Sequence, residues 1–138
     1  MAAYNKFENF VEDLGKGVHD LANDTLKVML SNVAPSATNT VKSQITDIAD
    51  GDGYTAGGAA VTNTFTESGG TAIAGATNVV WTSSGTIGPF RYVVLYNDTP
   101  TSPVKPLIGW WDNTTSVTLN SGDTFTVDFG SNRLFTIT

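Results

Sequence analysis

Asp47, Asp50 and Asp52 are the side chains of this sequence best placed to bind a metal ion. Hard cations such as Ca²⁺ prefer grouped carboxylate oxygens, and Gly51 and Gly53 would let the backbone curve around an ion. The spacing departs from that of the EF-hand loop, whose ligands recur at every second position. Aspartate and glycine are also the ordinary residues of turns. We therefore interpret the three aspartates as a helix end followed by a turn, and we expect neither a metal nor a cofactor.

His19 is the single histidine, and the sequence contains no cysteine, so the usual ligands of a zinc site are missing. A serine nucleophile would be expected in a Gly-x-Ser-x-Gly turn, and no serine has these neighbours. The glycine-rich segment 53–58 lacks the lysine and the following helix of a phosphate-binding loop. We therefore predict no catalytic residue. His19 is expected to pack in the interior or at an interface, and the glycine-rich segment to form a turn.

Aromatic residues could form a platform on which a sugar ring stacks. The candidates are Trp81, Tyr92, Tyr96, Trp110 and Trp111. Trp110 and Trp111 are adjacent, so in a strand their side chains face opposite sides. One of them is expected in the core, and the other is either covered by the N-terminal segment or exposed as an anchor. Trp110 is kept as a candidate interface residue.

Arg91 stands at the head of an apolar strand and needs a partner if it is buried. Asp98 and Asp112 lie at the ends of the two strands that we expect to pair, so either carboxylate could serve. An exposed pair of this kind would contribute little to stability. The expected role of Arg91 is structural in both cases.

These side chains must be positioned by short β-strands. Polar and apolar residues alternate through most of residues 59–137, and Asn120–Asp123 and Gly130–Asn132 carry turn signals. Tyr92–Tyr96 is apolar on both faces, which is typical of a central strand covered on both sides, and Leu107–Trp111 is its expected neighbour. The pattern predicts a mainly β protein with one domain, a jelly-roll-like antiparallel β-sandwich over 23–138. One short helix is expected near 40–49, where Val41, Ile45 and Ile48 have helical spacing.

An apolar stripe marks the N-terminal segment, which we predict to be an arm or helix over 1–22. The stripe consists of Tyr4, Phe7, Phe10, Val11 and Leu14. Burying one such side chain contributes roughly 1.5–3 kcal/mol, so the stripe should dock, either on its own sandwich or on a neighbouring molecule. We favour a neighbour because Gly15 and Gly17 could act as a hinge. These five residues, with Trp110, are the candidate interface.

The composition limits the possible partners. The chain has 138 residues, of which 14% are charged, below the roughly 25% of ordinary soluble domains. The surface is therefore expected to be rich in hydroxyl and amide groups. A net charge of −6 with seven scattered lysines and arginines argues against a nucleic-acid partner. No run approaches the ~20 apolar residues of a membrane-spanning helix, so we expect no membrane partner.

Three strings of residues carry a family resemblance: GPFRYVVLYNDT at 88–99, LIGWWD at 107–112 and GDTFTVDFG at 122–130. The chain resembles small structural proteins encoded among the virion genes of tailed phages, and within these it is similar to capsid decoration, or cement, proteins. The resemblance implies a trimer on the outer surface of the capsid that clamps neighbouring capsomers. The implied partners are the major capsid protein and further copies of the chain. The protein would be made in the cytoplasm of the host bacterium and would reside in the virion.

A second hypothesis remains open beside capsid decoration. The chain could be a binding module of a tail or fibre that contacts carbohydrate on the cell surface, with the aromatic residues as its platform. Tail adhesins are usually one domain of a longer fibrous chain, and no shaft or repeat is seen here, which favours the head. The resemblance supplies no catalytic or ligand-binding residues.

Overall fold

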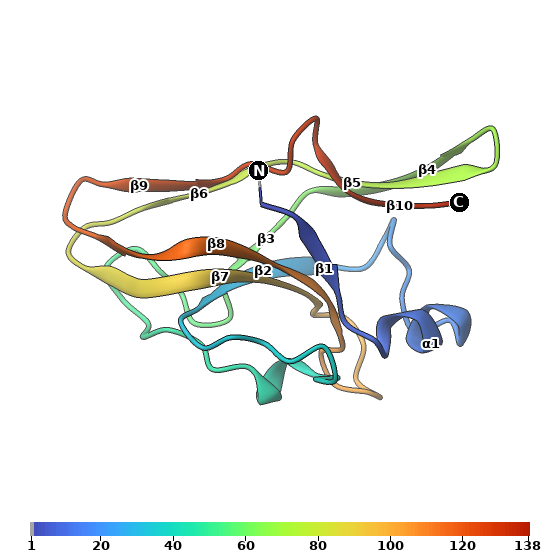
Figure 1. Cartoon of the computed structure of the whole chain (residues 1–138), viewed down its shortest axis with the longest axis horizontal. Coiled ribbons are helices and arrows are strands. Elements are labelled where there is room, and N and C mark those ends of the chain that lie inside the picture. Colours follow the sequence, from blue (N-terminus) through green and yellow to red (C-terminus); the bar gives the residue numbers. More distant parts are fainter. Residues whose placement is uncertain (1) are drawn as a thin grey trace.

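The computed structural model describes residues 2–138 and shows a mainly β protein, with 48% of the residues in strands and 7% in helical turns. The strands form antiparallel sheets stacked in two layers, as Figure 1 shows, so the predicted single-domain antiparallel β-sandwich is confirmed.

The first layer is a five-stranded sheet with the strand order β1-β8-β7-β2-β3. Its strands are β1 (Tyr4–Lys6), β2 (Leu26–Ser31), β3 (Ala59–Ala60), β7 (Ile87–Asn97) and β8 (Leu107–Leu119). The predicted pairing of Tyr92–Tyr96 with Leu107–Trp111 is confirmed, since Val93 faces Trp111 and Val94 faces Trp110 across β7 and β8. β7 lies at the centre of this sheet.

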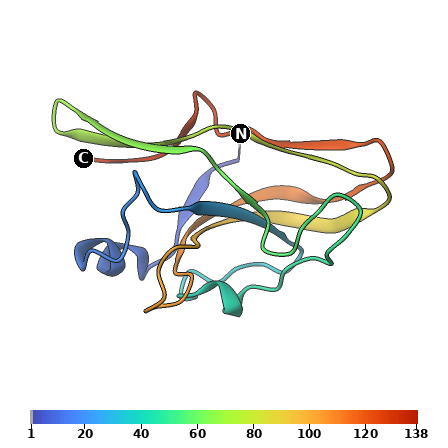
Figure 2. The same ribbon diagram turned by 180° about the vertical axis from the view of Figure 1, so that it is seen from behind.

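The second layer contains a three-stranded sheet, β10-β5-β4, and a two-stranded sheet, β6-β9. Its strands are β4 (Asn63–Ser68), β5 (Thr71–Ala76), β6 (Val79–Thr82), β9 (Thr124–Val127) and β10 (Arg133–Ile137). Because β5 leads directly into β6, and β9 into β10, the two small sheets continue one antiparallel ribbon. Figures 1 and 2 show the β4–β5 hairpin projecting beyond the first sheet, and we call this part of the three-stranded sheet the overhang.

Alternation along β7 explains why both faces of the first sheet are covered. Val93 and Leu95 enter the main core between the layers. Val94 and Tyr96 point to the opposite face and join a second, smaller core. That second core also contains Phe7, Met29, Ile45 and Leu107.

The expected helix near 40–49 is wrong apart from a single 3₁₀ turn, η1 (Lys42–Gln44). The Gln44 side-chain oxygen accepts the backbone N–H groups of Thr40, at 2.6 Å, and of Val41, which closes the turn. Ile45 is already extended, and the Ile48 N–H then donates to the carbonyl of Leu30 at 3.3 Å. Of the apolar residues at helical spacing, Ile45 thus covers the outer face of the sheet from an extended chain, whereas Ile48 packs against the main core.

The N-terminal segment is an edge strand and a short helix of the sandwich rather than a separate arm, and residue 1 of the predicted arm lies outside the described residues. β1 pairs with β8, and α1 (Phe10–Gly15) follows it. Phe7 is 0% exposed and Phe10 is also buried, so the preference for docking on a neighbour is corrected for both. Gly109 permits this arrangement, because a Cβ at that position would overlap the ring of Tyr4.

Deleting residues 1–14 should therefore destabilise the sandwich itself. Removing the buried Phe7 and Phe10 side chains alone forfeits about 3–6 kcal/mol, a large part of the roughly 5–15 kcal/mol that stabilises an ordinary domain. Urea unfolding followed by tryptophan fluorescence measures the loss. Val11→Ala is the control, because Val11 is 53% exposed; its unfolding free energy should stay within about 0.5 kcal/mol of the wild-type value. An unchanged midpoint for the truncated chain would contradict this assignment.

Candidate functional site

Asp47 holds the glycine-rich segment 53–58 against the first sheet. Its two carboxylate oxygens accept hydrogen bonds from the Tyr54 hydroxyl and from the Gly57 backbone N–H, both at 2.6 Å. The Tyr54 hydroxyl also accepts the backbone N–H of Leu30 at 3.1 Å. Burial raises the pKa of Tyr54, so the phenol stays protonated and remains a donor to Asp47. These bonds fasten the loop to β2.

Asp50 and Asp52 likewise accept backbone hydrogen bonds. Asp50 accepts the N–H of Ala56 at 2.6 Å, and Asp52 accepts the N–H of Thr86 at 3.2 Å. Within residues 2–138 the histidine and acidic side chains form no group of three or more that could hold a metal ion. The arrangement is that of three loop-anchoring carboxylates.

His19 lies in a buried polar cluster with Asn97 and Asp24. The Asn97 amide nitrogen donates to Asp24 at 2.7 Å, and the Asn97 amide oxygen accepts the backbone N–H of Thr99 at 3.1 Å. These two bonds fix the amide orientation, so the 3.0 Å contact with His19 Nδ1 is a hydrogen bond that His19 accepts. The ring also packs against Phe10, with centroids 5.2 Å apart. His19 therefore ties the segment before β2 to the end of β7.

Burial lowers the pKa of His19 below its ordinary value of 6.5, although the carboxylates of Asp13 and Asp24 act in the opposite direction. The geometry agrees, since a proton on Nδ1 would confront the amide hydrogens of Asn97. Asp13 Oδ2 and His19 Nε2 are both buried without a hydrogen-bond partner among the described residues. The folded protein thus favours the neutral imidazole.

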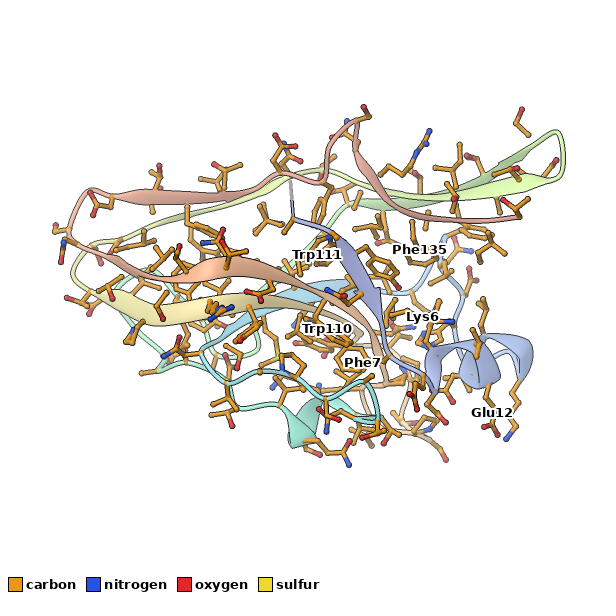
Figure 3. All side chains as sticks on the ribbon, in the orientation of Figure 1. Lys6, Phe7, Glu12, Trp110, Trp111 and Phe135 are labelled. Atoms are coloured by element: carbon orange, nitrogen blue, oxygen red, sulfur yellow. The ribbon has the colours of Figure 1, made fainter. Side chains whose placement is uncertain are left out.

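The two adjacent tryptophans face opposite sides of β8, as Figure 3 shows. Trp111 is buried in the main core, with its ring centroid 5.5 Å from that of Phe129. Trp110 is half-buried and packs on Phe7 at 4.6 Å between ring centroids. The question that the sequence left open is settled: the N-terminal segment covers the outward-facing Trp110. A stacking platform from these two indoles is not formed.

Arg91 binds Asp112 with two hydrogen bonds, from Nε at 2.8 Å and from one terminal nitrogen at 3.0 Å. This hydrogen bonding lowers the pKa of Asp112. Asp98 instead binds Lys105 at 2.7 Å and Lys27 at 3.2 Å. Because Arg91 and Asp112 are partly exposed, the pair orients neighbouring strands and contributes little to stability.

One side of the sandwich is left open where the edge of the first sheet faces β9 and β10. Tyr4 bridges the middle of this side: its ring stacks on Phe135 with centroids 5.3 Å apart and lies 5.5 Å from Trp111. Burial raises the pKa of Tyr4, whose hydroxyl donates to the carbonyl of Ile108 at 3.3 Å. A hollow lies on each side of this bridge.

The larger hollow, of about 560 Å³, lies between the N-terminal segment and β10, and we call it the α1–β10 groove. Its walls are mostly apolar and include two exposed aliphatic side chains, Val11 and Ile137 at 36% exposure. The lining residues are Tyr4, Lys6, Phe10, Val11, Leu14 and Leu134–Thr138. Four of the six candidate interface residues therefore meet here, whereas Phe7 and Trp110 lie in the second core.

The smaller hollow, of about 430 Å³, lies between β8 and β9, and we call it the β8–β9 hollow. Trp111 and Phe125 form its aromatic part, and Asn113, Thr126 and Asp128 supply polar groups. Sequence reasoning missed both the β10 wall of the groove and this hollow. Residues 125–137 alternate as ordinary strands do, and nothing in that alternation indicates which edge of a strand remains uncovered.

Comparisons of the chain with protein-family models, with curated proteins and with solved structures found no match. Among residues 2–138, the helices lack the length and the apolar character that a membrane crossing by a helix requires.

We predict that Asp47→Ala lowers the unfolding free energy by about 2–4 kcal/mol, because it leaves the buried Tyr54 hydroxyl and the Gly57 N–H without their acceptor. Chemical denaturation measures the change, and Asp52→Ala, which removes one exposed acceptor, should cost less.

Calcium or a chelator should leave the melting temperature unchanged. A calcium-dependent rise that disappears in the Asp50→Ala, Asp52→Ala double variant would contradict the loop-anchoring role.

His19 should make stability fall in mild acid. The pKa of His19 in the folded state is lowered from 6.5. As the pH falls below 6.5, the unfolded chain therefore binds a proton at His19 more readily than the folded chain does. The contribution of neutral His19 is therefore complete above about pH 6.5 and is lost as the pH falls below it, by at most about 1.4 kcal/mol per pH unit. Urea unfolding between about pH 8 and about pH 5 should show this loss for the wild type relative to His19→Gln. Parallel pH profiles for the two proteins would refute the assignment.

Proposed function

We propose that this protein is a non-enzymatic structural component of a phage virion, and specifically a capsid decoration protein. It would bind the outer surface of the capsid as a homo-oligomer and stabilise contacts between capsomers. Its partners would be the major capsid protein and further copies of the chain, with a trimer as the expected oligomer.

The observation that carries the proposal is the α1–β10 groove. Apolar recesses that a folded protein leaves exposed are typical of surfaces that bind another protein. Val11 and Ile137 remain exposed in this groove, although burying such side chains is favourable. A protein that completes its apolar packing only by assembly is suited to a particle built from many copies.

The chemically versatile side chains support the same proposal because they are already engaged in the fold. Asp47, His19 and Arg91 each bind other parts of the chain. The outer surface carries largely hydroxyl and amide groups, such as those of the exposed threonines of β4. Such groups lose less than charged groups when a contact excludes water, which favours extended, permanent contacts.

The strings that carry the resemblance occupy the structural framework. Residues 88–99 and 107–112 belong largely to the paired strands β7 and β8, and residues 122–130 contain β9. Their most buried members, such as Phe90, Leu95 and Ile108, pack inside the protein. The resemblance is therefore one of framework, and it supports a common fold more directly than a common binding surface.

A second candidate function has a specific location in the structure. The β8–β9 hollow combines aromatic Trp111 and Phe125 with the polar side chains of Asn113, Thr126 and Asp128. Sugar-binding sites use aromatic faces with polar groups at their rim. A tail-associated module that contacts cell-surface carbohydrate would use this hollow.

Locating the protein on the particle separates the two candidates. We expect an antibody against the chain to label phage heads in electron micrographs, and we expect heads that lack the protein to rupture at a lower temperature. Adding the purified wild-type chain should restore the rupture temperature, because bridging neighbouring capsomers opposes their separation. Labelling confined to tails, together with polysaccharide binding that is lost in an Asn113→Ala, Asp128→Ala variant, would establish the alternative.

A further inference from the structure

The α1–β10 groove contains the ammonium group of Lys6, which forms no ion pair with any carboxylate of residues 2–138. Five of the seven lysines and arginines form ion pairs: Lys16, Lys27, Lys42, Arg91 and Lys105. The other two, Lys6 and Arg133, have no carboxylate within 4.0 Å among residues 2–138, and only Lys6 lines the groove. A mostly apolar recess with one free ammonium group matches a segment that presents an apolar side chain next to a carboxylate.

The strand β10 beside the groove is a free edge. In the three-stranded sheet β10-β5-β4, the two outer strands each have one unpaired side. Free edges expose backbone N–H and C=O groups that can pair with a strand of another chain. The sheet can therefore be extended at both of its sides, at β10 and at β4.

The outermost strand, β4, carries the complementary side chains. Phe65 pairs with Ala74, which pairs with Phe135, so these three lie on the face turned toward the core. Glu67 lies two residues further along β4 and therefore on the same face, in one row with Ala72 and Ile137. Glu67 is exposed and has no ion pair in the described chain, although it accepts the Gly70 N–H at 2.7 Å.

We propose that the α1–β10 groove binds the overhang of a second copy of this chain, with β4 of that copy pairing along the free edge of β10. A strand added there would turn Phe65 and Glu67 toward the groove. Phe65 would then approach Val11 and Ile137, and Glu67 would approach Lys6. Charge complementarity favours this occupant, because β4 carries both a carboxylate, Glu67, that can pair with Lys6 and an aromatic ring, Phe65, that can enter the apolar groove.

The contact joins two different surfaces, β4 of one copy and β10 of the next, so each copy keeps one donor edge and one acceptor edge. Contacts of this heterologous kind generate closed rings when the rotation between copies closes, and open chains when it does not. A ring of three would satisfy every edge in the proposed trimer. The inference rests on the proposed function only in taking the chain to be a homo-oligomer.

Charge reversal tests the contact in solution. The wild-type chain should sediment as an oligomer, and Lys6→Glu or Glu67→Lys alone should weaken association at least about tenfold, because each replaces an attraction by a repulsion. The double variant Lys6→Glu, Glu67→Lys should recover the wild-type assembly. The two single variants mixed in equal amounts should associate with each other, since each supplies the edge that the other lacks.

Asp123→Lys is the matched control, since it changes the net charge as Glu67→Lys does but lies in the exposed turn before β9, outside β4, β10 and the groove lining, and it should leave association unchanged. Melting curves establish that every variant is folded. A monomeric wild type, single variants that associate like the wild type, or a double variant that stays monomeric would each overturn the proposal. Binding of the same variants to heads that lack the protein separates the two claims: if Lys6→Glu and the wild type are both monomeric yet both decorate heads, capsid decoration stands and the copy-to-copy contact fails.

Discussion

The architecture depends on the burial of β7 on both of its faces. Neighbouring residues of this strand enter different cores: Leu95 joins the main core between the layers, and Tyr96 joins the second core beneath the loop that contains η1. A strand covered in this way requires a layer on each side, which accounts both for the second layer of the sandwich and for the long connection between β2 and β3. The loop is in turn held by the hydrogen bonds of Asp47, and Tyr96 donates to the Gly57 carbonyl at 2.5 Å.

Buried polar groups give this apolar framework its fixed connections. Asn97, at the end of β7, is fully buried, yet its amide bonds to His19, Asp24 and Thr99. Leaving such groups without partners would cost more than each bond contributes, so the cluster allows one arrangement of the segment before β2. The same reasoning explains why the side chains that looked chemically capable in the sequence are structural here. These side chains are already hydrogen-bonded within the chain. The surfaces that remain available for contacts with other molecules are strand edges and recesses.

The spacing of apolar residues along the sequence correctly predicted the elements whose structure depends on local sequence. The apolar runs at 92–96 and 107–111 correctly indicated neighbouring strands, and the apolar character of both faces of 92–96 correctly indicated a central strand. The pattern failed where a tertiary contact decides the outcome. Val41, Ile45 and Ile48 have helical spacing, but an extended chain lets Ile45 reach the second core. The stripe of residues 4–14 also read as a helix, whereas its first part pairs with β8 because Gly109 leaves room for Tyr4. The groove arises between segments more than a hundred residues apart, which no local pattern records.

That separation along the chain has a consequence for synthesis. The edge strand β1 is synthesised long before its partner β8: Tyr4 donates to the carbonyl of Ile108, 104 residues further on. Until β8 emerges, Tyr4 has no strand to pair with and Phe7 lacks the ring of Trp110 on which it packs. The sandwich therefore closes late, and non-local pairing of this kind slows folding and prolongs the exposure of apolar side chains. A nascent chain arrested before β8 would be prone to aggregate, so rapid and complete translation matters more for this protein than for one built from local hairpins.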